Sequence, residues 1–321
     1  MYKILDIVLG YKRIKLLYYL RGVYYSIRFR LWSARYSFDS SRRRQCLDDE
    51  YAYIEGRVNY YNGLKAGTPL GPLAKRIGDL DRREASDVYY FDAVEYLVYF
   101  DCDKMANTLF GDVNYSPDFP SIVKSRPVGD SRNSVLLKLN KVRHFNFVND
   151  RRDFSSKKDQ LIGRGFLSEG KTLRVSFLER HFGNPLCDVG HVNDFRGNQW
   201  RVGYASVYEQ LAYKFILCWE GNDVASNLKY VMSSSSLAVA TKPKFETWFM
   251  EGQLVGGVHY VEIKDDFSDL DEKIIYYSTH IDEAEKIIEN ANSFTRQFQD
   301  RRREDLISLL VLDKYFRNTI E

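Results

Sequence analysis

Hydrophobic and polar residues follow two periods along the chain, one typical of helices and one typical of strands. Residues 215–263 show both most clearly. An apolar run at 215–219 ends in a glycine-containing turn, and a helical pattern follows at 224–232. Two β-prone runs, 237–240 and 258–263, come next. Strand-like runs that alternate with helical patterns indicate an α/β architecture with mainly parallel sheets.

Helical periodicity predicts further helices at residues 48–64, 173–181, 269–277, 281–298 and 305–315. A strand is expected within residues 136–147, and the charged residues 149–160 look like a linker or an exposed hairpin. The 321 residues are enough for two domains of ordinary size. We therefore expect an N-terminal domain at 1–150, a second domain at 151–300 and a final helix at 301–321.

The turn after residues 215–219 is a candidate anion site. It contains Gly221, Asn222 and Asp223 and leads into the predicted helix at 224–232. A strand, a glycine turn and a helix N-terminus form such a site because the free N–H groups of the first turn and the positive end of the helix dipole point the same way. An ordinary βα turn of an α/β domain has the same pattern, so both interpretations stay open.

Three charged residues stand near predicted strand ends. Asp112 follows a glycine at the end of an apolar run, and two prolines keep the chain beyond it extended. α/β enzymes place catalytic carboxylates at strand ends, although an aspartate that caps a turn has the same pattern. Residues 160–165 read as a strand that runs into a glycine turn containing Arg164, and Arg174 lies in the next helix. Each arginine offers bidentate donors to a phosphate, but each also fits a solvated surface.

Candidate metal ligands are few. Asp101-Cys102-Asp103 has the form of a metal-binding DxD triplet, but Lys104 beside it opposes a cation, which favours a solvated loop or a helix start. The four cysteines are widely spread and form no CxxC pair. This spacing predicts no zinc site, and two of the cysteines stand among apolar residues, which fits reduced thiols.

Residues 1–45 carry many lysines and arginines, few acids, and many leucine and aromatic residues. A basic aromatic helix is typical of a segment that lies on an anionic membrane surface; the alternative is a helix packed on its own domain with a solvated basic rim. Nucleic acid is a weaker alternative, because the net charge is only +3 and no nucleic-acid-binding motif occurs. Without a membrane-spanning apolar run or a signal-peptide pattern, we expect a cytoplasmic protein, peripheral at the inner face of the cytoplasmic membrane.

Three longer stretches carry a resemblance to a known family: EGNDVASNLKYVMSSSSLAV at 220–239, PKFETWFMEGQLVGGVHYVEIKDDFSDL at 243–270 and GDVNYSPDFPSIVKSRP at 111–127. Together they resemble glycosyltransferase family 90. The likeness covers roughly residues 88–320 and is greatest to the bacterial lipopolysaccharide-modifying branch. The family also contains animal protein O-glucosyltransferases and fungal capsule xylosyltransferases.

The resemblance implies a GT-B fold, in which two Rossmann-like domains face each other across a cleft and the C-terminal helix returns toward the N-terminal domain. It also implies inverting transfer of a hexose or pentose from a UDP-sugar, without a metal and without a cofactor besides this co-substrate. The implied acceptor is a hydroxyl of a lipopolysaccharide or lipooligosaccharide core, or of a similar lipid-linked glycan.

Individual residues match the family's motifs. The resemblance implies Asp112 as the general base, which takes the proton of the acceptor hydroxyl. Arg164-Gly165 matches the family's Arg-Gly turn, and Arg174 matches its following phosphate arginine, although the spacing between them differs from that of the animal branch.

The family's nucleotide loop matches the donor-binding candidates Gly221, Asn222, Val224, Ala225, Ser226, Asn227 and Lys229. Eukaryotic members have Arg-Phe-Lys where this chain has Asn227-Leu228-Lys229, so phosphate binding would depend more on Lys229, the arginines and backbone N–H groups. Glu246 is expected at the ribose hydroxyls. Trp248 either stacks beside it or belongs to the core, and His259 is expected in the core.

Two other functions remain open. In the first, the chain is a protein or capsule glycosyltransferase of the same family. In the second, it is a non-catalytic module that binds nucleotide sugars. The presence of Asp112 together with Arg164 and Lys229 favours an active enzyme.

Overall fold

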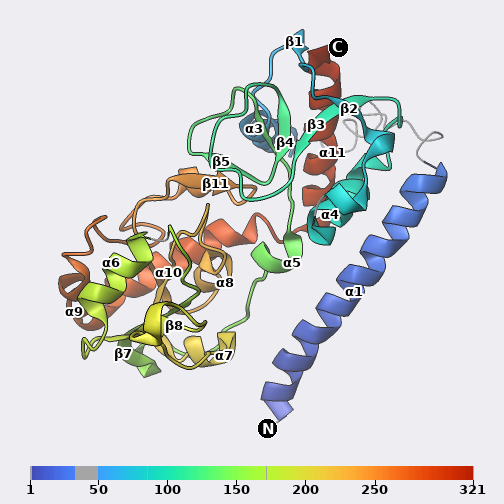
Figure 1. Ribbon diagram of the computed structural model, residues 1–321. Coiled ribbons are helices and arrows are strands. Elements are labelled where there is room, and N and C mark those ends of the chain that lie inside the picture. The colour runs from blue at the N-terminus through green and yellow to red at the C-terminus, as the bar shows by residue number, and fades with distance from the viewer. Residues whose placement is uncertain (1, 33–49, 85, 171, 321) are drawn as a thin grey trace. The chain divides into compact units, whose positions relative to one another are not determined.

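The computed structural model describes residues 2–32, 50–84, 86–170 and 172–320 (Figure 1). The chain divides into two compact units. Unit 1 comprises Met1–Arg143, Phe245–Trp248 and Asp300–Glu321, and unit 2 comprises His144–Lys244 and Phe249–Gln299. Helices and parallel sheets occur in both units, so the predicted α/β architecture is confirmed.

Unit 1 contains helices α1 (Tyr2–Trp32), α3 (Tyr51–Tyr61), α4 (Asp87–Leu97) and α11 (Arg301–Asn318), and strands β1 (Thr68–Pro69), β2 (Lys75–Arg76), β3 (Met105–Leu109), β4 (Ser121–Val123), β5 (Ser125–Pro127), β6 (Ser134–Leu136), β11 (Phe245–Thr247) and β13 (Thr319–Ile320). Its main sheet has the order β2-β3-β4-β6. Strands β3, β4 and β6 are parallel, and β2 is antiparallel to β3. Two further pairs are β1 with β13, parallel, and β5 with β11, antiparallel.

A buried ionic cluster joins distant parts of unit 1. Glu304 in α11 accepts hydrogen bonds from Arg57 at 3.0 Å, Lys138 at 3.3 Å and the indole nitrogen of Trp248 at 2.5 Å. Trp248 also stacks on Tyr61, with ring centroids 3.9 Å apart. Trp248 is therefore a core residue of unit 1, one of the two positions that the sequence allowed.

Unit 2 contains helices α6 (Thr172–His181), α7 (Val207–Gln210), α8 (Leu228–Met232), α9 (Leu270–Thr279) and α10 (Ile281–Arg296), and strands β7 (Lys158–Gly165), β8 (Cys187–His191), β9 (Tyr213–Leu217), β10 (Leu237–Ala240) and β12 (Val261–Glu262). Helix α5 (Lys141–His144) lies at the change from unit 1 to unit 2. The five strands form one sheet of order β12-β10-β9-β7-β8, and every neighbouring pair is parallel.

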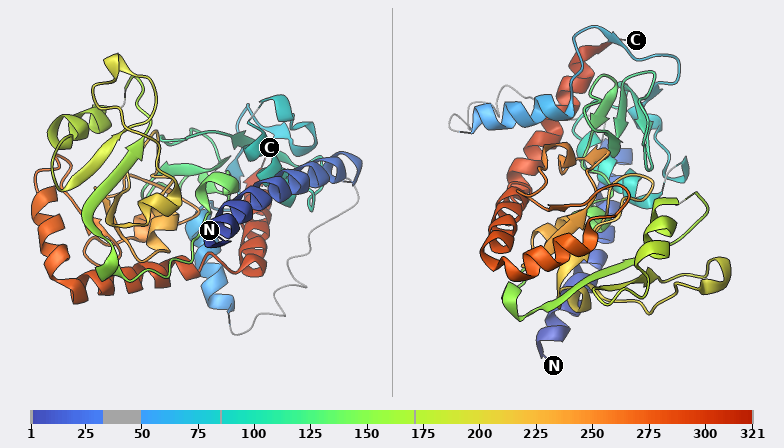
Figure 2. Two further views of the ribbon diagram at one scale, coloured as in Figure 1. Left: turned by 90° about the horizontal axis from the view of Figure 1, so that it is seen from below. Right: turned by 90° about the vertical axis from the view of Figure 1, so that its left-hand side faces the viewer.

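One face of this sheet packs against α6, α9 and α10 (Figure 2). Leu161, Phe215 and Val239 lie on this face, and Phe177 of α6 and Ile274 of α9 cover them. Strands of a parallel sheet are buried and read as short apolar runs, which is why the sequence pattern indicated β7, β9, β10 and β12. It did not indicate β8.

Three local predictions need correction. The strand expected within 136–147 is wrong, since β6 ends at Leu136 and Asn140 has a φ of 54°. The expected linker at 149–160 is instead held in unit 2, because buried Lys157 forms an ion pair with Asp150 at 2.5 Å. The helix expected at 224–232 begins only at Leu228.

Of the basic aromatic segment expected at 1–45, residues 33–45 lie outside the described residues. Residues 2–32 form α1, which confirms the predicted helix. Within the part of the chain that the structure describes, no helix combines the length and apolar character needed to cross a membrane.

Candidate functional site

Asp112 lies just beyond the carboxyl end of β3 in unit 1. Gly111 before it has a φ of 144°, which an L side chain rarely adopts. Lys124 comes directly after β4, and because β3 and β4 are parallel, their carboxyl ends share one edge. The Nζ atom of Lys124 is 2.5 Å from Oδ1 of Asp112, and the hydroxyl of Tyr89 donates to the same oxygen at 3.3 Å.

This arrangement suits a proton acceptor. The Asp112 side chain is 27% exposed, so a substrate hydroxyl has access to it, whereas Lys124 is 2% exposed. A carboxylate accepts a proton in its ionised form, and Lys124 provides it with a positively charged partner. The sequence did not reveal Lys124 or Tyr89 as neighbours. Strand β4 was not predicted because prolines stand just before it, at 117 and 120, and proline is unfavourable within a strand.

Arg174 lies at the carboxyl edge of the unit 2 sheet. Its Nη1 donates to the carbonyl oxygen of Phe166 at 2.8 Å, and its guanidinium carbon is 5.6 Å from the centre of the Trp219 ring. Phe166 follows β7 and Trp219 follows β9, so Arg174 spans the ends of two adjacent strands. Gly165 stands beside it, with Nη1 3.6 Å from the point where a Cβ would lie. Parallel α/β sheets bind ligands at this edge.

The loop after β9 runs past the same edge. Gly221 donates its N–H to the carbonyl oxygen of Asp223 at 3.1 Å, and the Asn227 side chain donates to that of Leu217 at 2.9 Å, which ties the loop to the strand. Asn222 is exposed. Helix α8 begins at Leu228 and has five residues, so its dipole is weaker than the helix predicted from 224 would provide.

Val224 and Ala225 are buried, and Ser226 is half-buried. The first two therefore contribute the shape and the backbone of the loop, because their side chains have no polar atoms.

Lys229 is fully buried in unit 2 and forms an ion pair with Glu251, which is 1% exposed. Its Nζ atom also lies 5.2 Å from the centre of the Phe249 ring. As the structure stands, this ammonium group stabilises the interior beside α8 and is not at the loop surface.

Glu246 belongs to unit 1, where it pairs with the Nε atom of Arg126 at 2.8 Å and accepts a hydrogen bond from the hydroxyl of Tyr60. Both partners of the Glu246–Arg126 ion pair are about 98% buried or more. This pair joins β11 to β5. His259 is half-buried, 5.3 Å from the Phe294 ring.

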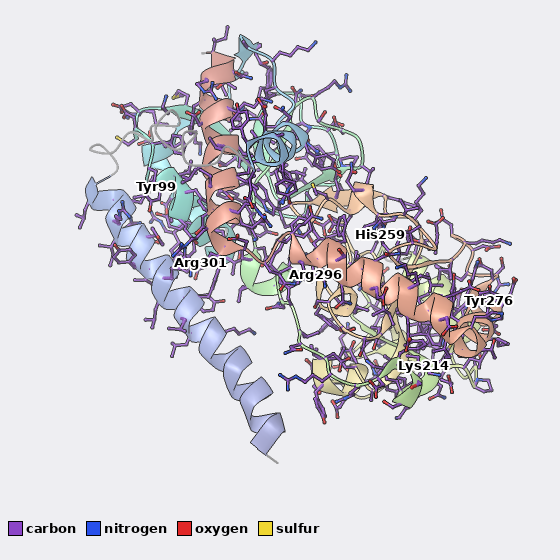
Figure 3. The ribbon with its side chains drawn as sticks, turned by 180° about the vertical axis from the view of Figure 1, so that it is seen from behind. Tyr99, Lys214, His259, Tyr276, Arg296 and Arg301 are labelled. Carbon is purple, nitrogen blue, oxygen red and sulfur yellow. The ribbon has the colours of Figure 1, made fainter. Side chains whose placement is uncertain are left out.

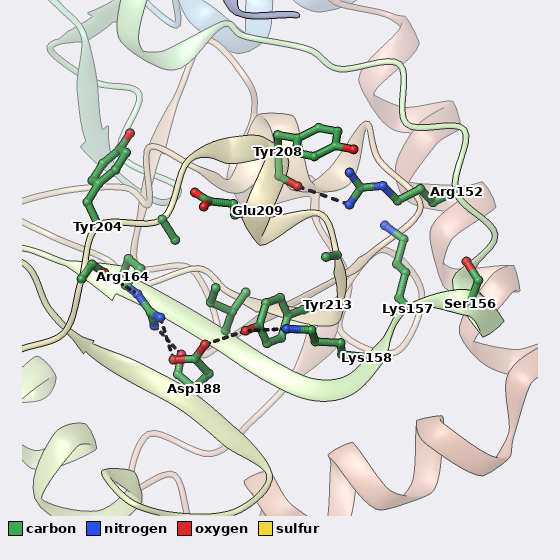
Figure 4. A pocket seen from close by; sticks show the side chains of 14 residues that line it. Arg152, Ser156, Lys157, Lys158, Arg164, Asp188, Tyr204, Tyr208, Glu209 and Tyr213 are labelled. Carbon is green, nitrogen blue, oxygen red and sulfur yellow. Dashed lines mark hydrogen bonds and ion pairs between the residues drawn. The ribbon is translucent and has the colours of Figure 1, made fainter. Parts of the chain in front are cut away.

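Arg164 lines a cavity of about 610 Å³ on the sheet face of unit 2 (Figure 4). Its Nη2 is 2.6 Å from Oδ1 of Asp188, and its Nε donates to the carbonyl oxygen of Gly203 at 3.0 Å. Tyr213 donates to the other oxygen of Asp188 at 2.6 Å. Successive residues of a strand point to opposite faces of the sheet. Gly163 and Gly165 therefore lie on one face of the sheet, and the Arg164 side chain lies on the other. The structure thus brings Arg174, and not the Arg164 side chain, to the loop after β9.

Asp101 and Asp103 lie in an exposed turn between α4 and β3. Asp103 is 3.5 Å from the guanidinium of Arg76, and its N–H donates to the side chain of Asp101. The triplet is therefore a solvated turn, as the sequence suggested.

Comparisons with known proteins agree with the resemblance seen in the sequence. The model of Glycosyl transferase family 90 matches residues 184–306. The O-glucosyltransferase LpsA of Dichelobacter nodosus is 43% identical over 267 residues, which are 83% of this chain and 83% of that protein. The matched family segment includes the loop after β9, but Asp112 and Arg174 lie outside it.

Proposed function

The chain belongs to glycosyl transferase family 90 and is a glycosyltransferase, and from this premise we propose that it moves one sugar from a UDP-sugar to a hydroxyl of a lipopolysaccharide-type glycan, with Asp112 as the general base. Glucose is the first sugar to test, because the similar protein is an O-glucosyltransferase. The observation that carries the proposal is the accessible Asp112 carboxylate, held beside Lys124 at a strand end.

The proposed reaction is a single displacement. Asp112 takes the proton of the acceptor hydroxyl, and the hydroxyl oxygen attacks the anomeric carbon from the side opposite the nucleotide. The new carbon–oxygen bond forms as the bond to the β-phosphate breaks, so the anomeric configuration inverts. The acceptor proton remains on Asp112, and the electron pair of the broken bond leaves with UDP.

The departing diphosphate gains negative charge, and fixed donors in a water-poor site stabilise that charge most effectively. Arg174 and the N–H groups of the loop after β9 are the donors we assign to it, with Gly165 leaving room beside Arg174. Arg164, Lys229 and Glu246 then act indirectly, by holding β7, α8 and β11 in place. No metal is needed in this scheme.

A GT-B arrangement is part of the proposal. It requires unit 1 and unit 2 to face each other across a cleft, so that Asp112 and Arg174 reach the same donor sugar.

A thermal-shift screen of UDP-, GDP- and ADP-sugars tests donor binding. We expect the melting temperature Tm to rise selectively with UDP-glucose, since a ligand that binds only the folded protein stabilises it by mass action. UDP release in the presence of an acceptor separates an enzyme from a non-catalytic binding module. Equal shifts with all three nucleotides, or binding without turnover, would contradict the proposal.

We also propose that α1 lies on an anionic membrane surface. One side of α1 packs on α4, with Tyr99 just beyond the end of α4 (Figure 3). The hydroxyl of Tyr18 donates to the Val88 carbonyl oxygen at 3.1 Å, and Arg28 donates to Tyr99 at 3.4 Å. Gly22 makes this contact close, because a Cβ there would lie 2.5 Å from Phe91.

The opposite side of α1 carries an apolar stripe, with spacings of three and four residues that place its members on one helix face. Its five side chains are 44–69% exposed: Leu16, Leu20, Val23, Ile27 and Leu31. The exposed cations Lys15 and Arg30 border the stripe. An apolar face with a basic border fits the interface of an anionic bilayer, and peripheral attachment at the inner face of the cytoplasmic membrane would bring the enzyme to a lipid-linked acceptor.

A further inference from the structure

His181, Cys187 and Asp271 meet at the amino edge of the unit 2 sheet, opposite the edge that carries Arg174. His181 is the last residue of α6, Cys187 is the first residue of β8, and Asp271 lies in the first turn of α9. One ligand atom from each residue lies within 4.8 Å of the other two, and Nδ1 of His181 is 3.9 Å from Oδ1 of Asp271. We propose that these three side chains bind Zn²⁺.

The hydrogen bonds of His181 prepare its ring for a metal. Nε2 lies 3.2 Å from the carbonyl oxygen of Phe267, and because a carbonyl only accepts, Nε2 carries the proton. Nδ1 therefore presents its lone pair. It is buried, and among the described residues it has no hydrogen-bond partner. Metal-binding histidines usually donate their other N–H to a carbonyl or carboxylate, so a buried lone pair beside a thiol and a carboxylate suits a bound cation.

The charges of the three ligands also fit. On binding, Zn²⁺ would displace the Cys187 thiol proton to solvent, and its two positive charges would balance one thiolate and one carboxylate.

The geometry requires only a small contraction. Bond lengths of about 2.3 Å to sulfur and 2.0–2.2 Å to nitrogen and oxygen place tetrahedral ligands roughly 3.3–3.7 Å apart. Asp271 can supply the movement, because its side chain is 52% exposed, while Asn184 donates to its Oδ1 at 2.8 Å and orients it. A water on this exposed side would complete the coordination.

The mixed nitrogen, sulfur and oxygen set selects Zn²⁺ over Mg²⁺ and Ca²⁺, which prefer oxygen ligands. The absence of CxxC pairs led the sequence to predict no zinc site, but here three separate elements supply the ligands. The ion would hold α6, β8 and α9 together and would take no part in sugar transfer.

Metal titration of the chelator-treated full chain tests this proposal. We expect one Zn²⁺ per chain and a rise in Tm on the order of 5 °C at saturating Zn²⁺. Co²⁺ should give the strong near-ultraviolet absorption of a cobalt–thiolate bond. No saturable Zn²⁺ binding in the micromolar range would overturn the proposal.

Three variants identify the ligands. Cys187→Ser should remove the cobalt–thiolate absorption, and the matched Cys218→Ser, at another buried cysteine, should keep it. Asp271→Asn, at a side chain that is 52% exposed, should weaken Zn²⁺ binding about tenfold or more. Unchanged affinity in Asp271→Asn, or cobalt–thiolate absorption that survives Cys187→Ser or disappears in Cys218→Ser, would contradict the site.

Discussion

Buried ion pairs decide what several charged residues do. Lys229 and Glu251 are 0% and 1% exposed, and Arg126 and Glu246 are similarly buried. Two charges taken out of water are tolerated only when each compensates the other. These side chains therefore hold their units together.

Breaking the buried pair in unit 2 should be costly. We expect Glu251→Gln to lower the free energy of unfolding by about 3–5 kcal/mol, because it leaves the Lys229 ammonium buried without its carboxylate. Urea unfolding measures this. The control is Glu289→Gln, whose exposed pair with Lys286 should contribute less than about 1 kcal/mol. Similar losses in both variants would show that Lys229 is not held as described.

Asp92 in α4 makes the stability of the fold depend on pH. Burial raises its pKa from 3.8 to about 6, against the opposing effect of Lys141, while Glu95 raises it further. Between about pH 4 and pH 6, Asp92 is therefore more often protonated in the folded chain than in the unfolded chain. Its contribution to the free energy of unfolding falls as pH rises through this range.

Asp92→Asn should remove that slope. We expect wild type to lose on the order of 1–3 kcal/mol relative to Asp92→Asn between pH 4 and pH 7, measured by urea unfolding at both values. Asp79→Asn, at an exposed carboxylate, is the control. A difference between wild type and Asp92→Asn that does not change with pH, or that shifts in favour of wild type as pH rises from 4 to 7, would contradict the burial of Asp92.

At the scale of elements, helix α1 has one face that packs on the domain and one face that is exposed. The side with Tyr18, Gly22 and Arg28 packs on α4, while the stripe from Leu16 to Leu31 remains exposed. The sequence posed membrane contact and packing on the domain as alternatives. The structure shows the packing on α4, and because that contact uses only one face, it leaves the other open to a membrane.

Leu20→Gln combined with Ile27→Gln tests the stripe. We expect the fraction that sediments with vesicles of anionic lipid to fall at least about fivefold, since each change removes a side chain of roughly 1.5–3 kcal/mol in apolar transfer. Ile275→Gln on α9, 56% exposed, is the matched control and should sediment normally. Binding to neutral vesicles should be weak for all three proteins. Equal sedimentation of the double variant and wild type would contradict a membrane role for α1.

At the scale of the whole molecule, the sequence predicted four of the five strands of the unit 2 sheet, because these buried strands are short apolar runs between helices; it missed β8. Strand β10 coincides with the run predicted at 237–240. Predictions failed where distant contacts override local pattern. Residues 245–248 belong to unit 1 although the chain around them is in unit 2, and no local signal marks such an exchange.

In the candidate site, too, local pattern indicated residues but not their distant partners. The motif around Asp112 drew attention to the carboxylate, but its pairing with Lys124 follows from the parallel register of β3 and β4. The cations predicted for phosphate were chosen by residue type and spacing. Spacing does not reveal that Lys229 forms an ion pair with Glu251, or that Arg164 forms one with Asp188.

The most direct test of the central claim is the rate of sugar transfer from UDP-glucose to a lipopolysaccharide core acceptor by Asp112→Asn, measured beside wild type. We expect a loss of about 10²-fold or more in the folded variant, because it keeps the shape of the side chain and loses its ability to take a proton. Its Tm should fall as well, because buried Lys124 loses its carboxylate, so the rate is measured well below the Tm of both proteins. Asp118→Asn, an exposed change in the same loop, should transfer at the wild-type rate. Near-normal transfer by Asp112→Asn would contradict the account.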